Sequence, residues 1–373
     1  MLAADIRNPT APEWKKVPKL KRITKIILTV ALATVAVCAL WACSSTSSSS
    51  SSSSTSAATP ASTSTSASAA TSTSTADAAT IRVASLKGPT SIGLVSLMDR
   101  AKAGRTTDTY EFTVAGTADE IVPQIIKGDF DIALVPANVA SVLYNKTQTN
   151  VTALDINTLG VLYVVTGDTS VNSFSDLAGK TVYMTGKGTT PEYVMNYLLA
   201  QNGLTDQVTL EFKSEATEVA SALASDTNAI GVLPEPYVTA VTTKNAALSA
   251  RVSLTDAWNA SVSDGSQLVT GVTIVRNDFL AQHPDAVARF VKEQSDSVAA
   301  VNADPTGMSQ SVVDAGIVDS AGVAAKAIPH CNLVCITGSQ MKTALSGYLN
   351  VLYQQDASSV GGTVPGAAFY YQS

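Results

Sequence analysis

The stretch Ser85-Leu86-Lys87-Gly88-Pro89-Thr90-Ser91-Ile92-Gly93-Leu94 follows a short apolar run at residues 80–85 and ends where a helical pattern begins. A strand, a glycine–proline turn and a helix in this order are typical of an open α/β sheet. Gly88 lets the backbone approach a ligand closely, and the hydroxyls of Thr90 and Ser91 are suited to capping the helix. Free N–H groups at the helix start favour an anionic or polar acceptor, and Lys87 adds a positive charge. The alternative is an ordinary turn with a solvent-facing lysine.

The same alternation of strand and helix continues along residues 80–373. The expected strands are apolar runs rather than strict alternations, which favours a buried parallel sheet with helices on both faces. Strands are predicted at 80–85, 110–116, 130–136, 152–167, 181–186, 208–214, 228–236 and 267–277, and helices at 91–102, 118–127, 137–145, 189–203, 215–224 and 283–301.

The pattern predicts two similar α/β units, with a chain that leaves the first unit and later returns to it. The expected fold class is therefore α/β, with two hinged lobes, each an open sheet with flanking helices. We expect lobe 1 to comprise residues 80–165 and 266–373, and lobe 2 residues 166–265. This length is ample for a core and is near the size at which chains divide into two lobes.

Five loops follow the carboxyl ends of the expected strands, where open α/β sheets bind their ligands. Glycines and hydroxyl residues recur in them, so two opposed loops, around Gly88 and around Gly188, are expected to form the two sides of a cleft. The predicted ligand-binding residues are Leu86, Lys87, Gly88, Pro89, Thr90, Gly116, Thr117, Pro136, Asn138, Gly186, Gly188, Thr189, Thr190, Glu235 and Gln267.

Several of these residues have a simpler interpretation. Asn138 and Thr190 are also plausible helix N-caps, the latter followed by Pro191 at the first helical position. Glu235 lies between two prolines, so that its carboxylate either meets a cationic or amine-bearing ligand or caps its own loop. Trp258 is expected to pack in the core rather than stack on a ligand.

The segment 1–42 reads as an export signal, with a basic stretch followed by an apolar run that ends at Leu40-Trp41-Ala42-Cys43. A leucine three positions before a cysteine, and an alanine directly before it, resemble a bacterial lipoprotein box. We therefore expect lipidation at Cys43. The alternative is an uncleaved anchor at residues 23–42. Ser/Thr/Ala sequence at 43–79 buries too little surface to fold, and is expected to be a disordered linker.

Charge divides the chain in the same way. The segment 1–42 carries seven basic and two acidic side chains, or +5, so the net −6 of the whole chain leaves −11 from Cys43 onward. An acidic exported domain argues against a nucleic-acid partner.

Cys331 and Cys335 lie beside His330 in the sequence HCNLVCITG. The spacing allows a disulfide in an oxidising compartment or two buried thiols, and too few ligands accompany His330 to predict a metal site. His283 and His330 have no nucleophile placed beside them by a motif. The sequence therefore predicts no enzyme activity, no catalytic residues and no cofactor.

The segments SLKGPTSIGLVSLMD, GDFDIALVPANVA, LPEPYVT and SSVGGTVPGAAFYY resemble the substrate-binding lipoproteins of bacterial ABC transporters that serve sulfonates, nitrate and thiamine-precursor pyrimidines. The resemblance implies a type II periplasmic-binding-protein fold, a small-molecule ligand and an ABC permease as partner. It also implies a monomer that is held on the outer side of the cell membrane by its lipid. Two other possibilities stay open: an enzyme of a menaquinone or thiamine-precursor pathway with the same fold, and a tethered sensory or adhesive module.

If the two opposed loops hold the ligand, Gly88→Val and Gly188→Val should each weaken ligand binding, because a branched side chain prevents close approach of the backbone. The measurement is the ligand-induced thermal shift of each variant. Intact binding in both variants would show that these loops do not hold the ligand.

Overall fold

The structure is a computed structural model that describes residues 78–147 and 150–372, which fall within one compact unit of the chain, residues 72–373. The expected export signal, Cys43 and nearly all of the linker lie outside the described residues. Within the described ranges, no helix combines the length and the apolar character that crossing a bilayer requires.

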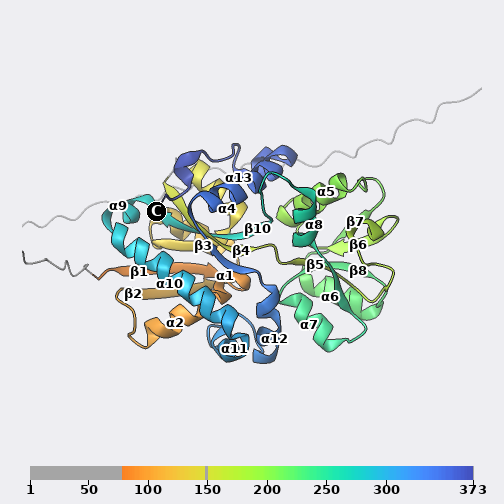
Figure 1. Ribbon diagram of the computed structural model, residues 1–373, viewed down its shortest axis with the longest axis horizontal. Coiled ribbons are helices and arrows are strands. Elements are labelled where there is room, and N and C mark those ends of the chain that lie inside the picture. Colours follow the sequence, from red (N-terminus) through yellow and green to blue (C-terminus); the bar gives the residue numbers. More distant parts are fainter. Residues whose placement is uncertain (1–77, 148–149, 373) are drawn as a thin grey trace, which may run out of the picture. The chain divides into compact units, whose positions relative to one another are not determined.

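The first sheet has six strands in the order β11-β4-β10-β3-β1-β2 (Figure 1). β1 is parallel to β2 and β3, whereas β10 is antiparallel to both β3 and β4, and β11 is antiparallel to β4. Its strands are β1 (Thr80–Leu86), β2 (Thr109–Ala115), β3 (Ile132–Pro136), β4 (Val151–Leu159), β10 (Val269–Arg276) and β11 (Leu333–Ile336).

The second sheet has five strands in the order β7-β6-β8-β5-β9. β6 is parallel to β7 and β8, and β5 is antiparallel to β8 and β9. Its strands are β5 (Leu162–Thr166), β6 (Thr181–Met184), β7 (Thr209–Phe212), β8 (Ile230–Pro234) and β9 (Ser249–Ser253). The two-sheet α/β class is confirmed. The parallel pairing that the apolar runs favoured holds for β1 with β2 and β3 and for β6 with β7 and β8. Each sheet also contains antiparallel pairs, made by β10 and β11 in the first and by β5 in the second.

Two segments join the sheets. Gly160 and Val161 link β4 to β5, and residues 262–268 link the helix after β9 to β10. The second sheet thus takes in residues 162–166, part of which the sequence placed in lobe 1. The exact lobe boundaries stay a prediction.

Helices cover both faces of each sheet (Figure 1). On one face, a single apolar cluster includes α3, α4 and α13 of the first sheet together with α5 and α8 of the second. The opposite face of the first sheet is covered by α2, α9, α10, α11 and α12. The opposite face of the second sheet is covered by α6 and α7. The helices are α1 (Pro89–Ile92), α2 (Val95–Lys102), α3 (Ala118–Lys127), α4 (Ala137–Lys146), α5 (Thr190–Gln201), α6 (Ala216–Ser225), α7 (Tyr237–Lys244), α8 (Leu254–Ser261), α9 (Asn277–Gln282), α10 (Pro284–Ala303), α11 (Pro305–Asp314), α12 (Ala321–Ala327) and α13 (Gly338–Gln355). Four short 3₁₀ segments complete them: η1 (Phe174–Leu177), η2 (Ile328–His330), η3 (Ala357–Val360) and η4 (Ala367–Phe369).

Three expectations about helix starts need correction. The helix expected at 91–102 is divided into α1 and α2, because the backbone tightens at Leu94, whose N–H donates to Ser91 O, and Gly93 lies against Val298 of α10. Asn138 is not an N-cap, since α4 begins at Ala137 after Pro136. Thr190 is the first residue of α5 and Thr189 its N-cap.

Asp155 of β4 is completely buried beneath α10. Its Oδ1 atom accepts hydrogen bonds from Thr273 Oγ1 and Gln294 Nε2, both at 3.0 Å. Its Oδ2 atom is buried and has no partner among the described residues. Burial raises the pKa of Asp155 to about 7, and the two hydrogen bonds only partly offset this effect. Below about pH 7 the protonated carboxyl is therefore the form that the folded protein favours.

Since the pKa of Asp155 is higher in the folded than in the unfolded chain, the unfolded state loses its proton first as the pH rises. The free energy of unfolding should therefore fall between about pH 4 and pH 7, by at most about 1.4 kcal/mol per pH unit from this group. Asp155→Asn should reduce this fall in urea titrations across the range, whereas the exposed Asp206→Asn should leave it unchanged. Equal pH profiles for Asp155→Asn and the unmodified protein would contradict the assignment.

Candidate functional site

The carboxyl ends of β1, β3 and β4 and the start of β10 meet at the edge of the first sheet where the chain crosses to the second. Gly271 of β10 pairs with Pro136 at the end of β3, and a Cβ atom on Gly271 would lie 2.6 Å from Thr90 Cγ2 and 2.5 Å from Asn157 Oδ1. The structure thus brings Thr90 and Pro136 together at this edge.

The hydroxyl groups of the turn after β1 form hydrogen bonds within that turn. Thr90 Oγ1 and Ser91 Oγ both donate to the Leu86 carbonyl, at 3.0 and 2.6 Å. Lys87 is exposed, and its backbone N–H donates to Ala115 O at 2.9 Å. Gly88 has a φ of 112°, a conformation that favours glycine, and is followed by Pro89 at the first position of α1. Because α1 has only four residues, its dipole is a weak source of anion affinity.

The next two predicted loops differ in exposure. Thr117 forms a capping box with Glu120, whose Oε1 atom accepts from Thr117 N and Thr117 Oγ1, both at 2.9 Å. Gly116 beside it is exposed, and Asn138 is half-buried in the first turn of α4. The Thr117 hydroxyl therefore already has an acceptor within its own turn.

The loop after β6 is tight and largely exposed. Gly186 and Gly188 have φ angles of 84° and 70°, and the Thr189 hydroxyl donates to Gly186 O at 2.6 Å. Thr190 lies near the buried hydroxyl of Tyr348 in α13. Burial raises the pKa of Tyr348, and the nearby Thr190 partly offsets this effect. The Tyr348 hydroxyl has no hydrogen-bond partner among the described residues. The start of α5 therefore faces a helix of the first lobe.

Glu235 is buried, with 3% of its surface exposed, and it lies where the second sheet meets the crossover. Its backbone N–H donates to Val161 O at 3.0 Å. Its carboxylate accepts from Thr239 N at 3.2 Å and from Thr239 Oγ1 at 3.0 Å. The carboxylate thus caps the start of α7, as the simpler interpretation expected, and it also lines a cavity.

This cavity, called here the Glu235 cavity, has a volume of about 360 Å³. Both lobes contribute to it: β5, β9, α7 and the turn between β8 and α7 belong to the second lobe, and α12 and η2 pack on the first sheet. A cavity of this size with a few convergent polar groups is typical of a small-ligand site. Its lining residues are Tyr163, Glu235, Val238, Thr239, Thr242, Thr243, Ala250, Lys326 and His330.

Burial raises the pKa of Glu235 to about 7, against the effect of the two Thr239 hydrogen bonds. Burial, and then the charge of Glu235, raises the pKa of Tyr163 to about 12. The Tyr163 hydroxyl donates to His330 O at 3.1 Å and so connects the two walls of the cavity. A carboxyl that titrates near neutrality in a cavity is a frequent property of functional sites.

Gln267, in the second crossover, lines a different cavity of about 370 Å³. Its Oε1 atom is buried and has no partner within the described part of the chain. The other lining residues are Gly265, Ile336, Ser339, Gln340, Thr343 and Ala344. Gln267 and Glu235 are therefore not brought into one cavity.

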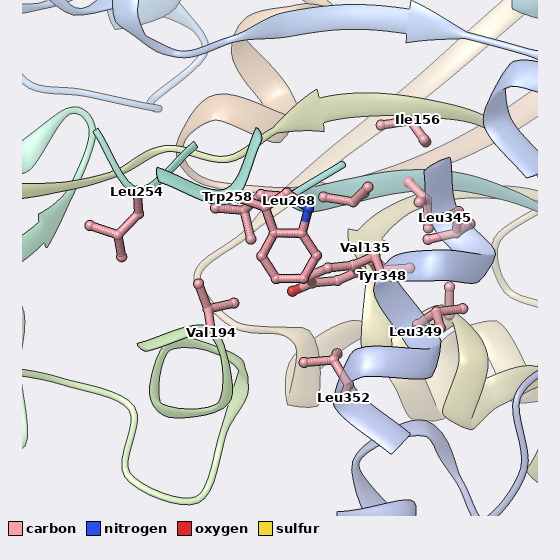
Figure 2. Packing of buried hydrophobic residues seen from close by; sticks show 14 of the residues in the cluster. Val135, Ile156, Val194, Leu254, Trp258, Leu268, Leu345, Tyr348, Leu349 and Leu352 are labelled. Carbon is pink, nitrogen blue, oxygen red and sulfur yellow. The ribbon is translucent and has the colours of Figure 1, made fainter. Parts of the chain in front are cut away.

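Aromatic side chains join the lobes on the face formed by α5, α8 and α13. Trp258 is completely buried, with ring centroids 4.7 Å from Tyr197 and 5.6 Å from Tyr348. Figure 2 shows Trp258 beside Tyr348. Nearby, Tyr193 Oη donates to Asp356 Oδ2 at 2.8 Å, and Gln355 Nε2 donates to Tyr193 O at 2.6 Å. Trp258 therefore packs, as expected, and it does so between the lobes.

Cys331 and Cys335 are free thiols, and burial raises the pKa of both. The sequence left open a disulfide or two thiols, and the structure contains the two thiols. No group of three His, Cys, Asp or Glu side chains in the described ranges is placed to hold a metal ion.

The sequence did not single out Tyr163, Lys326 or the present role of His330. Tyr163 appeared only as a strand residue, and Lys326 belongs to a short helix with no motif. Lys326 and His330 come near Glu235 because α12 packs against α7, whereas Tyr163 lies near it through the pairing of β5 with β8; both are contacts between segments far apart in the sequence. No local pattern predicts such a contact.

Residues 151–308 match a family model described as NMT1/THI5 like. No curated protein matches the chain in sequence. Among solved structures, an ABC transporter protein of Parabacteroides distasonis is similar with a TM-score of 0.67 and 22% identity, covering 79% of this chain and 99% of its own.

The periplasmic aliphatic sulphonate binding protein of Escherichia coli is similar with a TM-score of 0.63 and 11% identity, covering 79% of this chain and 92% of its own. A putative periplasmic sulfonate-binding protein of Methylobacillus flagellatus gives 0.55 and 18%, covering 76% and 88%. These similarities confirm the type II periplasmic-binding-protein fold predicted from the sequence, and they agree with the resemblance to substrate-binding proteins of ABC transporters.

Trp258→Ala should lower the free energy of unfolding by about 3–5 kcal/mol, because it removes a buried ring that fills the space between α5, α8 and α13. Tyr348→Phe should be nearly neutral, since it removes a buried hydroxyl without a hydrogen bond in the described structure. Urea denaturation of both variants measures the difference. Similar small losses in the two would show that this cluster does not hold the lobes together.

Proposed function

We propose that this protein is the extracytoplasmic substrate-binding component of an ABC importer, which captures a small polar or charged organic solute between its lobes and delivers it to a permease. The observation that carries the proposal is the Glu235 cavity, because its walls come from both lobes. A solute held there contacts both walls, and therefore stabilises the arrangement in which the lobes lie together.

The fold supports this function over catalysis. The solved structures with the same fold include binding components of transporters, and their printed names refer to binding or transport rather than to turnover. The cavity presents one carboxylate, hydroxyls, a lysine and a histidine, which suit recognition by hydrogen bonds and charge. The enzyme alternative has no support in these similarities.

The proposal includes the cellular arrangement expected from the sequence. Cys43 would carry the lipid, the Ser/Thr-rich segment 43–79 would act as a tether, and the folded part would work as a monomer on the outer side of the membrane. The glycines of the loops after β1 and β6 do not line the Glu235 cavity, so contact of the solute with Gly88 and Gly188 is a separate part of the proposal, tested by the two valine variants.

The purified protein should bind one class within a panel of sulfonates, nitrate, amino-pyrimidines, thiamine derivatives and small amines. Binding is measured by thermal shift and by small-angle scattering. A ligand at 100 times its dissociation constant should add about 2.7 kcal/mol of stability, and the protein should become more compact. Turnover of a candidate solute without compaction would refute the binding function.

A further inference from the structure

We propose that the solute bound in the Glu235 cavity carries a group that is cationic at neutral pH, of the aliphatic amine or guanidine type, which forms an ion pair with the Glu235 carboxylate. This inference rests on the proposed binding function and specifies the chemical class of its ligand.

The first observation is that Glu235 differs from the other buried carboxylates. Four acidic side chains of the described residues are buried: Asp108, Asp131, Asp155 and Glu235. Asp108 pairs with Arg289 at 2.7 Å and Asp131 with Arg82 at 2.6 Å, and each arginine holds the pKa of its carboxyl below the usual value. These two carboxylates are satisfied within the fold.

The other two carboxylates have no cationic partner within residues 78–147 and 150–372. Asp155 is closed into the core beneath α10, with no exposed surface. Glu235, in contrast, lines an open cavity. A buried carboxylate without a counter-ion is costly, and a cation entering the cavity would remove that cost.

Glu235 also keeps acceptor capacity. A carboxylate has about four lone-pair sites, and only two are used here, both by Thr239. An amine or guanidine donor can therefore bind without displacing the cap of α7. Thr242 and Thr243 line the same cavity, and their hydroxyl oxygens can accept further hydrogen bonds from the amine or guanidine group of the ligand.

The remaining charged and titratable groups are on the facing wall or behind it. Lys326 of α12 and His330 of η2 line the cavity from the first lobe, and Tyr163 of β5 lies between the walls. The charge of Glu235 also raises the pKa of the buried Cys331. Among the described residues, neither Lys326 nor His330 forms an ion pair with Glu235. A ligand with a cationic end at Glu235 and a polar or anionic end toward Lys326 fits this arrangement.

Affinity for such a ligand should depend on pH. Burial places the pKa of Glu235 at about 7, so that the unliganded carboxyl gains a proton as the pH falls below neutrality. A cation binds only the ionised form, and its affinity should therefore fall toward tenfold per pH unit below pH 7. A ligand without the cationic group should show no such loss.

The experiment compares aliphatic amines and guanidines with their isosteric alcohols, for example 4-aminobutanoate with 4-hydroxybutanoate and butylamine with butanol. Isothermal titration calorimetry is run at pH 8.5 and pH 6.0 on the full protein. At least one amine or guanidine should bind tenfold or more tightly than its alcohol, and should lose about tenfold in affinity at pH 6.0.

Glu235→Gln should abolish both the preference for the cation and its pH dependence, whereas Glu211→Gln, on an exposed residue of the same lobe, should retain both. His330→Asn removes the histidine that lines the same cavity; whatever its effect on affinity, the loss of affinity between pH 8.5 and pH 6.0 should persist if Glu235 is its source. If Glu235→Gln fails to fold, the pH series on the unmodified protein and on His330→Asn still tests the proposal.

The outcomes separate this inference from the proposed function. A solute that compacts the protein but binds without a cationic group, or equally well to Glu235→Gln, overturns the inference and leaves the binding function in place. Absence of binding and of compaction across the amine pairs and the wider solute panel overturns both.

Discussion

Gly160 lies where the two segments that join the sheets come together, and the lack of space there restricts how the two lobes can be arranged. A Cβ atom at Gly160 would lie 2.3 Å from Thr255 Oγ1 and 2.6 Å from Leu268 Cδ2, so only glycine fits there without rearrangement. Its carbonyl accepts hydrogen bonds from Thr255 Oγ1 and Asn332 Nδ2. One backbone carbonyl thus ties the outgoing segment to α8 of the second lobe and to Asn332, directly before β11 of the first sheet.

The neighbouring residue extends this arrangement to the candidate site. Val161 O accepts from Glu235 N, which fixes the end of β8 against the crossover. Glu235 then caps α7, and α7 lies against α12 of the first lobe. The buried carboxylate is therefore positioned by the same few residues that join the lobes. Movement of one lobe against the other would change the surroundings of Glu235 directly.

Particular elements show how far sequence reasoning reached. The helix predicted at 118–127 is α3 with the same bounds, since its capping box, its terminal glycine and its apolar spacing are all local signals. The division of 91–102 at Gly93 and Leu94 was missed, because the close approach of Val298 is a contact with a helix from a distant part of the sequence. The sequence also did not show that each sheet combines parallel and antiparallel strand pairs, because the apolar residues of a strand do not reveal in which direction its neighbours run.

The α/β class, the two units, the return of the chain and the glycine-rich loops follow from the amino-acid sequence, because they depend on local periodicity, turn residues and the resemblance of ordered segments. It also pointed to Glu235, through the rigid prolines on either side. The packing of the lobes was needed to show that Glu235 is buried with no counter-ion among the described residues, and that Lys326 and His330 line the same cavity. The physical reason is that burial and charge pairing are properties of contacts between distant segments, which no window of sequence contains.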